Sequence, residues 1–136
     1  MNIKKIATAP TNGTNTVQYV TIGGTPTAGT FKLAGQAGTT ASITWSATNA
    51  TLLANIQAKM DLIYGATNTL VEDVSLTAGI GVFKITFQND QGAVVVPVMT
   101  YVNSLTGTSP TLAIAIHSAG VEASFRSAQK GQLLLY

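Results

Sequence analysis

A two-residue alternation of apolar and polar positions marks the first third of the chain. It runs through residues 17–22, 31–33 and 39–45, and this period is typical of half-buried strands. The stretches 23–29 and 35–38 between them are rich in glycine and have the composition of turns. The pattern therefore predicts three strands joined as two consecutive hairpins.

The hydrophobic period lengthens after residue 47. Apolar side chains now recur at spacings of three and four, which places one stripe along a helix: Leu52, Leu53, Ile56, Met60 and Ile63. Thr48 or Asn49 can cap the start of this helix, and Gly65 stands where a left-handed stop is expected. We predict a helix over residues 48–64.

Strand-like runs return after the helix at residues 70–76, 82–87, 93–96 and 112–116. Pro97 indicates a sheet edge or a strand end after the third of these runs. The order of elements predicts an α+β fold dominated by β structure. We expect a mostly antiparallel sheet or sandwich of about seven strands, with one helix packed on it.

The length of 136 residues fits one domain with two extensions. Residues 1–16 lack a sustained period and are interpreted as an N-terminal arm, residues 17–120 as a single β-rich domain, and residues 121–136 as a C-terminal tail. The tail carries an apolar run that must be buried. It can add a strand to its own sheet or dock on a neighbouring subunit by strand addition.

The two extensions also hold all of the candidate partner-binding residues. Basic arms on a nearly neutral body are suited to docking on an acidic protein surface, although they can also be ordinary solubilising charges. The candidates, basic, aromatic and aliphatic, are Lys4, Lys5, Phe125, Arg126, Lys130, Leu133, Leu134 and Tyr136.

Composition favours a subunit that other molecules cover. Hydrophobic residues make up 46% of the chain but charged residues only 9%, against about 25% in ordinary soluble domains. Threonine, at 21 residues, makes a surface polar without charge. A net charge of +2 argues against nucleic-acid binding, and the longest apolar runs are too short for a membrane helix. The N-terminus does not resemble a signal peptide, so we expect a soluble, unprocessed product.

The chain offers little for catalysis. It has no cysteine and one histidine, His117, which lacks a nucleophile motif and further metal ligands nearby in sequence. Glu72 and Asp73 are adjacent on a predicted strand, so they point to opposite faces and cannot act as an acid–base pair. We therefore expect no enzymatic activity, no metal and no cofactor.

Several segments together resemble a module of tailed-bacteriophage virion proteins. That module has a V-Q-x-V-x-I strand, a G-T-P-T-x-G-T-F turn and strand, a T-T-x-x-I strand and a helix. The resemblance spans roughly residues 17–120, most of the chain, and is carried by short matching segments. They are V-Q-Y-V-T-I at 17–22, G-T-P-T-A-G-T-F at 24–31, T-T-A-S-I at 39–43, A-T-N-A at 47–50, F-K-I-T-F at 83–87 and V-P at 96–97. The G-T-P-T-A-G-T-F segment is the most specific of these. The helix is longer than in the module, and acidic residues are fewer.

The resemblance implies a non-enzymatic virion structural protein, most like a capsid decoration or cement protein. Such a protein would be made in the host cytoplasm and would bind the outer surface of the assembled head. Its implied partners are the major capsid protein and further copies of itself, and a trimer would fit the local three-fold positions of a capsid. A tail or fibre module that recognises the host surface is the alternative.

Overall fold

The computed structural model describes residues 13–122. It contains a six-stranded antiparallel sheet and one α-helix, which confirms the predicted β-dominated α+β class. The elements are β1 (Val17–Gly35), β2 (Gly38–Thr39), β3 (Ile43–Thr44), α2 (Asn49–Tyr64), β4 (Thr69–Asp73), β5 (Gly81–Phe87), the 3-10 helix η1 (Asn89–Gln91) and β6 (Thr100–Ser118).

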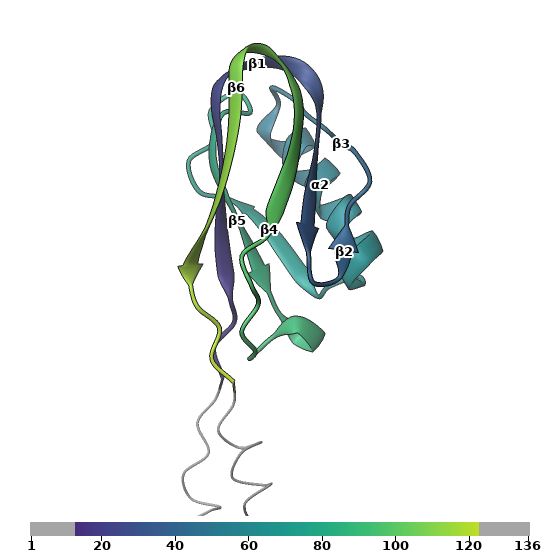
Figure 1. Ribbon diagram of the computed structural model, residues 1–136, viewed down its shortest axis with the longest axis vertical. Helices are drawn as coiled ribbons and strands as arrows, with labels where there is room; N and C mark the ends of the chain where they lie inside the picture. Colours follow the sequence, from purple (N-terminus) through teal and green to yellow (C-terminus); the bar gives the residue numbers. More distant parts are fainter. Residues whose placement is uncertain (1–12, 123–136) are drawn as a thin grey trace, which may run out of the picture.

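Strand β1 is the centre of the sheet. Its first limb, residues 17–22, pairs with β5, and its second limb, residues 30–35, pairs with the short strands β2 and β3. Along its other side it pairs with β6 over nearly the whole length of both strands. Each of these two strands is 19 residues long, and both fold over at the same end of the molecule (Figure 1).

The bend depends on glycines at which the two backbones nearly touch. The register between β1 and β6 shifts at Gly23/Thr25 and again at Pro26/Ala28. Gly24 has φ +71°, and a Cβ atom there would lie 2.0 Å from the carbonyl oxygen of Ser109 on β6. Only glycine combines this conformation with so close an approach.

Folding the strands over brings their two limbs face to face around the core. Val20 and Ile22 on the first limb and Phe31 and Leu33 on the second are fully or almost fully buried in one cluster. Helix α2 contacts β3 and β4 and adds a buried stripe at i, i+4 spacing: Leu52, Ile56, Met60 and Tyr64.

The helix spans the predicted range to within one residue. Thr48 is the N-cap residue, but its side chain makes no capping bond. The Asn49 side chain is directed elsewhere, since its Nδ2 donates to the Leu76 carbonyl and its Oδ1 accepts from the Gly79 amide. Gly65 ends the helix with φ +90°, and its N–H donates to the Asp61 carbonyl.

Two features of the predicted strand order are wrong. Residues 17–22 and 31–33 do not form a hairpin, because residues 23–29 bend a continuous strand instead of reversing it. The last strand covers Thr100–Ser118, far more than the predicted 112–116, because its pairing partner is the whole of β1.

The predicted strand over residues 93–96 is also wrong, because side chains hold this segment. The Thr16 hydroxyl donates to the Val94 carbonyl and accepts from the Val96 amide, both at 3.1 Å. Gln18 continues the pattern: its Nε2 donates to the Pro97 carbonyl at 2.8 Å and its Oε1 accepts from the Met99 amide at 2.9 Å. Two buried polar side chains therefore replace a strand ladder.

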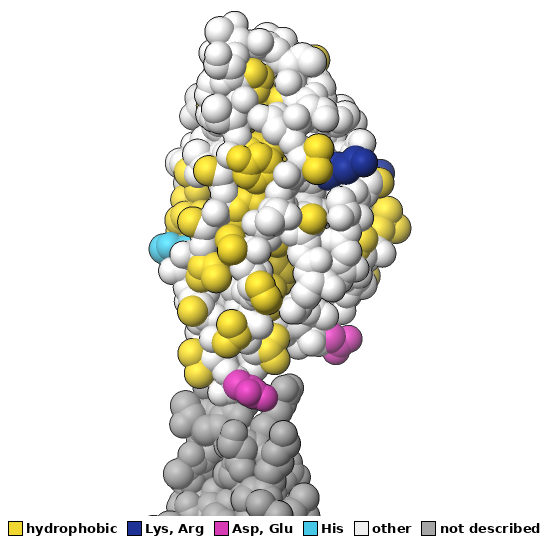
Figure 2. Space-filling model, in the orientation of Figure 1, with side chains coloured by type: hydrophobic (Ala, Val, Ile, Leu, Met, Phe, Trp, Pro, Cys, Tyr) yellow, Lys and Arg dark blue, Asp and Glu magenta, His cyan; other side chains and the backbone are white. Residues whose placement is uncertain are grey.

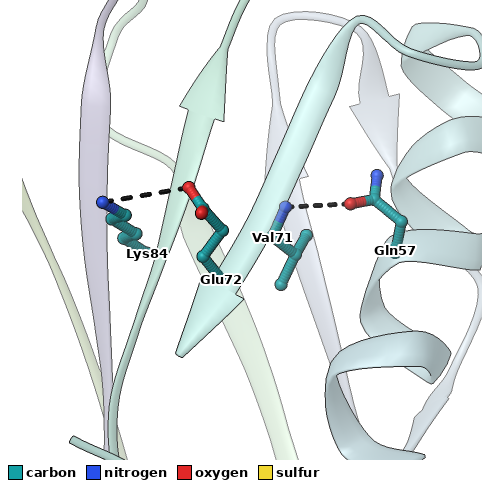
Figure 3. A network of polar contacts seen from close by, with 4 residues as sticks. All are labelled: Gln57, Val71, Glu72 and Lys84. Atoms are coloured by element: carbon teal, nitrogen blue, oxygen red, sulfur yellow. Dashed lines mark hydrogen bonds and ion pairs between the residues drawn. The ribbon is translucent and has the colours of Figure 1, made fainter. Parts of the chain in front are cut away.

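Strand β4 is at one edge of the sheet, and the helix covers that edge through a single side chain (Figure 3). The Val71 amide donates to Gln57 Oε1 at 2.8 Å, and Gln57 Nε2 donates to the Thr69 carbonyl at 2.9 Å. The Gln57 amide thus satisfies the backbone groups that a further strand would bind.

We expect Gln57→Met to destabilise the protein by about 1–3 kcal/mol, because it leaves the Val71 N–H and the Thr69 C=O without their partner. Chemical unfolding followed by far-UV circular dichroism measures this change. The matched control is Gln36→Met, at an exposed glutamine, which should stay within about 0.5 kcal/mol of the parent. Equal stability of the two variants would contradict the assigned role of Gln57.

Candidate interaction surface

The sequence-predicted partner-binding residues lie outside residues 13–122. They are Lys4, Lys5, Phe125, Arg126, Lys130, Leu133, Leu134 and Tyr136. What the structure does describe is where the two predicted arms begin. Thr14 and Val121 form a mutual pair of hydrogen bonds, each amide donating to the other's carbonyl at 2.9 Å. The described chain therefore enters and leaves the domain at one point, at the end opposite the bend (Figure 1).

The acidic side chains of the described part serve local contacts and do not converge. Glu72 lies 3.8 Å from Lys84 on the neighbouring strand β5, and its side chain is about half exposed (Figure 3). Asp73 accepts a hydrogen bond from the Leu76 amide at 2.8 Å. Within residues 13–122 no three His, Cys, Asp or Glu side chains come together as metal ligands.

The single histidine packs on an aromatic ring. His117 stacks on Tyr19 with ring centroids 4.0 Å apart and planes 7° from parallel. Burial raises the pKa of the Tyr64 phenol, and the neighbouring Ala37 backbone offsets part of that increase. Because an ordinary tyrosine already titrates near pH 10, Tyr64 stays protonated at neutral pH and offers no general base.

One hollow opens beside the end of β1. It has a volume of about 290 Å³ and is lined by Ala34, Gly35, Gln36, Pro97, Val98 and Thr100. The lining contains no charged side chain, so it has nothing to balance the charge of an ionic ligand. We assign it no ligand.

The exposed apolar side chains are concentrated around β6. Of the nine large hydrophobic side chains exposed in the described part of the chain, six lie between residues 95 and 121. We call these six the β6 apolar group: Val95, Val98, Tyr101, Val102, Ile116 and Val121. Their exposed fractions range from 41% to 65%, well above what a packed core residue retains. Because Tyr101 and Val102 are consecutive on β6, their side chains lie on opposite faces of the sheet, so the group flanks the strand on both faces. Uncovered apolar side chains in such a concentration are typical of a region that binds another protein.

The face that carries β6 is almost free of charge. Figure 1 shows β6 in front of β1, and the same view in Figure 2 shows apolar side chains gathered along the centre of that face. The charged side chains visible there lie at its margins (Figure 2). Strand β6 itself contains no Lys, Arg, Asp or Glu in its 19 residues. The low overall charge seen in the sequence is thus evident on this surface.

Comparison with known proteins leaves the chain without an assigned family: no protein-family model matches it, and no curated protein is similar to it in sequence. Among the helices of the described residues, none has the length and apolar character needed to cross a membrane.

Proposed function

We propose that this chain is a non-enzymatic structural subunit that binds the outer surface of an assembled bacteriophage head and stabilises it. The observation that carries the proposal is the nearly uncharged face around β6, with its uncovered apolar group. A protein that binds only the assembled shell stabilises that shell by mass action, and this requires no catalytic group.

The common origin of the two arms supports the same proposal. Because Thr14 and Val121 are hydrogen-bonded to each other, residues before and after them start side by side. Lys4 and Lys5 in one arm and Arg126 and Lys130 in the other can then reach the same acidic patch on a capsid protein.

A tail or fibre module that recognises the host remains the alternative, and one observation favours it. The stacked rings of Tyr19 and His117 form an aromatic platform on the domain, with His117 exposed. Aromatic side chains that present a flat apolar face and a polar edge are common in binding surfaces. Location of the protein in purified tails, together with glycan binding lost in Tyr19→Ala, would favour this function.

Co-sedimentation with heads that lack the protein tests the decoration function. We expect the full chain to bind stoichiometrically. A chain ending at Glu122 should bind at least about tenfold more weakly, which corresponds to about 1.4 kcal/mol of lost arm contacts. Ending the chain at Glu122 retains the Thr14–Val121 hydrogen bonds, so the truncated domain should melt at the same temperature as the full chain.

The result has three informative outcomes. Equal binding by both chains would keep the decoration function but assign the contact to the domain and not to the second arm. Absence of the protein from purified heads, with presence in tails, would transfer it to the tail apparatus. No binding to either structure would overturn the virion function.

A further inference from the structure

Strand β6 has one side that no other described strand covers. In residues 13–122 it pairs with β1 alone, so β6 forms an edge of the sheet along both of its limbs. The second limb, residues 111–118, is regular between Thr111 and Ile116 and carries an apolar alternation, Leu112, Ile114 and Ile116, on one face.

The hydrogen-bonding pattern of β1 shows which backbone groups are open. The Thr16 carbonyl accepts from Phe87 N–H on the β5 side. Successive residues of a strand direct their N–H and C=O groups to opposite sides, so every second residue after Thr16 also faces β5. Tyr19 and Thr21 lie between those residues and therefore direct their N–H and C=O groups to β6. They lie opposite Ala115 and Ala113.

The same alternation applies within β6. Since Ala113 and Ala115 bond to β1, the residues between and beside them direct their N–H and C=O groups to the open edge. These residues are Leu112, Ile114 and Ile116, and within residues 13–122 their backbone groups make no hydrogen bond to a side chain or a loop.

The outer edge of β4, by contrast, is covered. Gln57 satisfies the outer groups of β4, and Glu72 and Asp73 add charge to that strand. On the first limb of β6, the Leu105 amide donates to Asn103 Oδ1 at 3.0 Å. Natural proteins usually protect sheet edges by such covers or charges. Among the residues that the structure describes, neither a cover nor a charge of its own protects the second limb of β6.

We infer that the second limb of β6 is a self-association site, at which two copies of this chain pair antiparallel and join their sheets. The pairing is centred on Ile114, which lies opposite Ile114 of the second copy. The inference concerns contacts between copies and holds whether or not the chain binds a phage head.

The sequence of this limb is complementary to itself in that register. Residues whose backbone groups face the edge then meet one another, with Leu112 opposite Ile116 of the second copy. On the other face Ala113 meets Ala115, and Thr111 meets His117. Pro110, which has no N–H, limits the ladder at one end. A two-fold axis through Ile114 thus satisfies both copies with the same contacts.

Charge also favours a second copy over a different partner. A self-pairing interface brings every charged group of the patch against its own copy, and such like-charge contacts are costly. Strand β6 has no acidic or basic residue, so the pairing avoids this cost. Ile116, which is 41% exposed, lies on the paired limb and gains cover from the second copy.

Sedimentation equilibrium of the full chain, combined with amide hydrogen exchange, tests the inference. We expect a monomer–dimer equilibrium. In the dimer the amides of Leu112, Ile114 and Ile116 should exchange slowly. On dilution to the monomer, the exchange rates of all three amides should rise together. Ile116→Lys should raise the dimer dissociation constant at least about tenfold, because each copy then brings a charge to the shared edge.

Leu62→Lys is the matched control. Leu62 is 76% exposed on α2, away from β6, so this variant adds the same charge and should leave the dissociation constant unchanged. A chain that is monomeric at all concentrations with rapidly exchanging edge amides would overturn the inference. So would a monomer with protected edge amides, since its own arm would then cover the edge. A dimer that Ile116→Lys does not weaken would place the interface elsewhere.

Discussion

Replacing Gly24 by alanine should destabilise the fold by about 2–6 kcal/mol, the sum of backbone strain and overpacking. Gly24 has a positive φ of +71°, and the added Cβ would lie 2.0 Å from the Ser109 carbonyl oxygen. Since that oxygen belongs to the backbone of β6, no side-chain rotation can relieve the contact. The two strands must separate at the bend, where the limbs of both are held face to face.

Urea unfolding of the variant measures this effect, and Gly38→Ala is its control. Gly38 also has a positive φ, +121°, but a Cβ there meets nothing within 4 Å. The control therefore carries backbone strain without a steric contact, and should cost about 1–3 kcal/mol. If Gly24→Ala is no more destabilising than Gly38→Ala, the close approach at the bend does not limit the fold.

Phe83→Ala should have an effect of similar size, about 3–5 kcal/mol. Phe83 is fully buried on β5, which lies between β1 and β4. It pairs with Val20 on one side and Asp73 on the other, so the cavity opens in the middle of the sheet. Packing on both flanks prevents the core from collapsing into the space.

The measurement is again urea unfolding, in which a lower midpoint at constant slope reports a loss of stability. Leu62→Ala is the comparison, because this side chain is 76% exposed and its removal should change stability by no more than about 0.5 kcal/mol. Similar midpoints for the two variants would show that burial of Phe83 contributes little.

The helix was predictable because its signal is local. The apolar spacing from Leu52 to Ile63 defined both its range and its buried side, and three of the five stripe residues are fully buried. The other two, Leu53 and Ile63, are half-buried, and Tyr64 completes the buried stripe instead. The buried stripe is thus rotated slightly from the predicted one, because the helix packs against β3 and β4, which its own sequence does not specify.

The strands were less predictable because distant partners decide their limits. Glycine and proline in residues 23–29 have the same local preference whether the chain reverses or a continuous strand bends. Residues 100–110 are rich in Thr and Ser and lack an apolar alternation, yet they are a strand because β1 supplies their hydrogen bonds. Residues 93–96 show the reverse case: their apolar sequence predicts a strand, but hydrogen bonds from the Thr16 side chain hold them in a loop.

The candidate surface around β6 could not be located from the sequence. Low charge indicated a covered subunit, but the sequence directed attention to the arms, which lie outside residues 13–122. The open edge of β6 could not be found, because an edge strand is defined by the absence of a second neighbour. Alternation in Leu112, Ile114 and Ile116 predicts a strand equally well in the middle of a sheet.

The long pairing of β1 with β6 has a consequence for how the chain folds. Val17 pairs with Ser118, so the outermost rung of this ladder closes a loop of about a hundred residues. Pairings this distant in sequence slow folding, and we expect a millisecond-to-second process. During synthesis, the side of β1 that β6 later covers stays open until nearly the whole domain has left the ribosome. The unpaired side of β1 is therefore most open to wrong pairing and aggregation during translation, when this central strand has only one of its two neighbours.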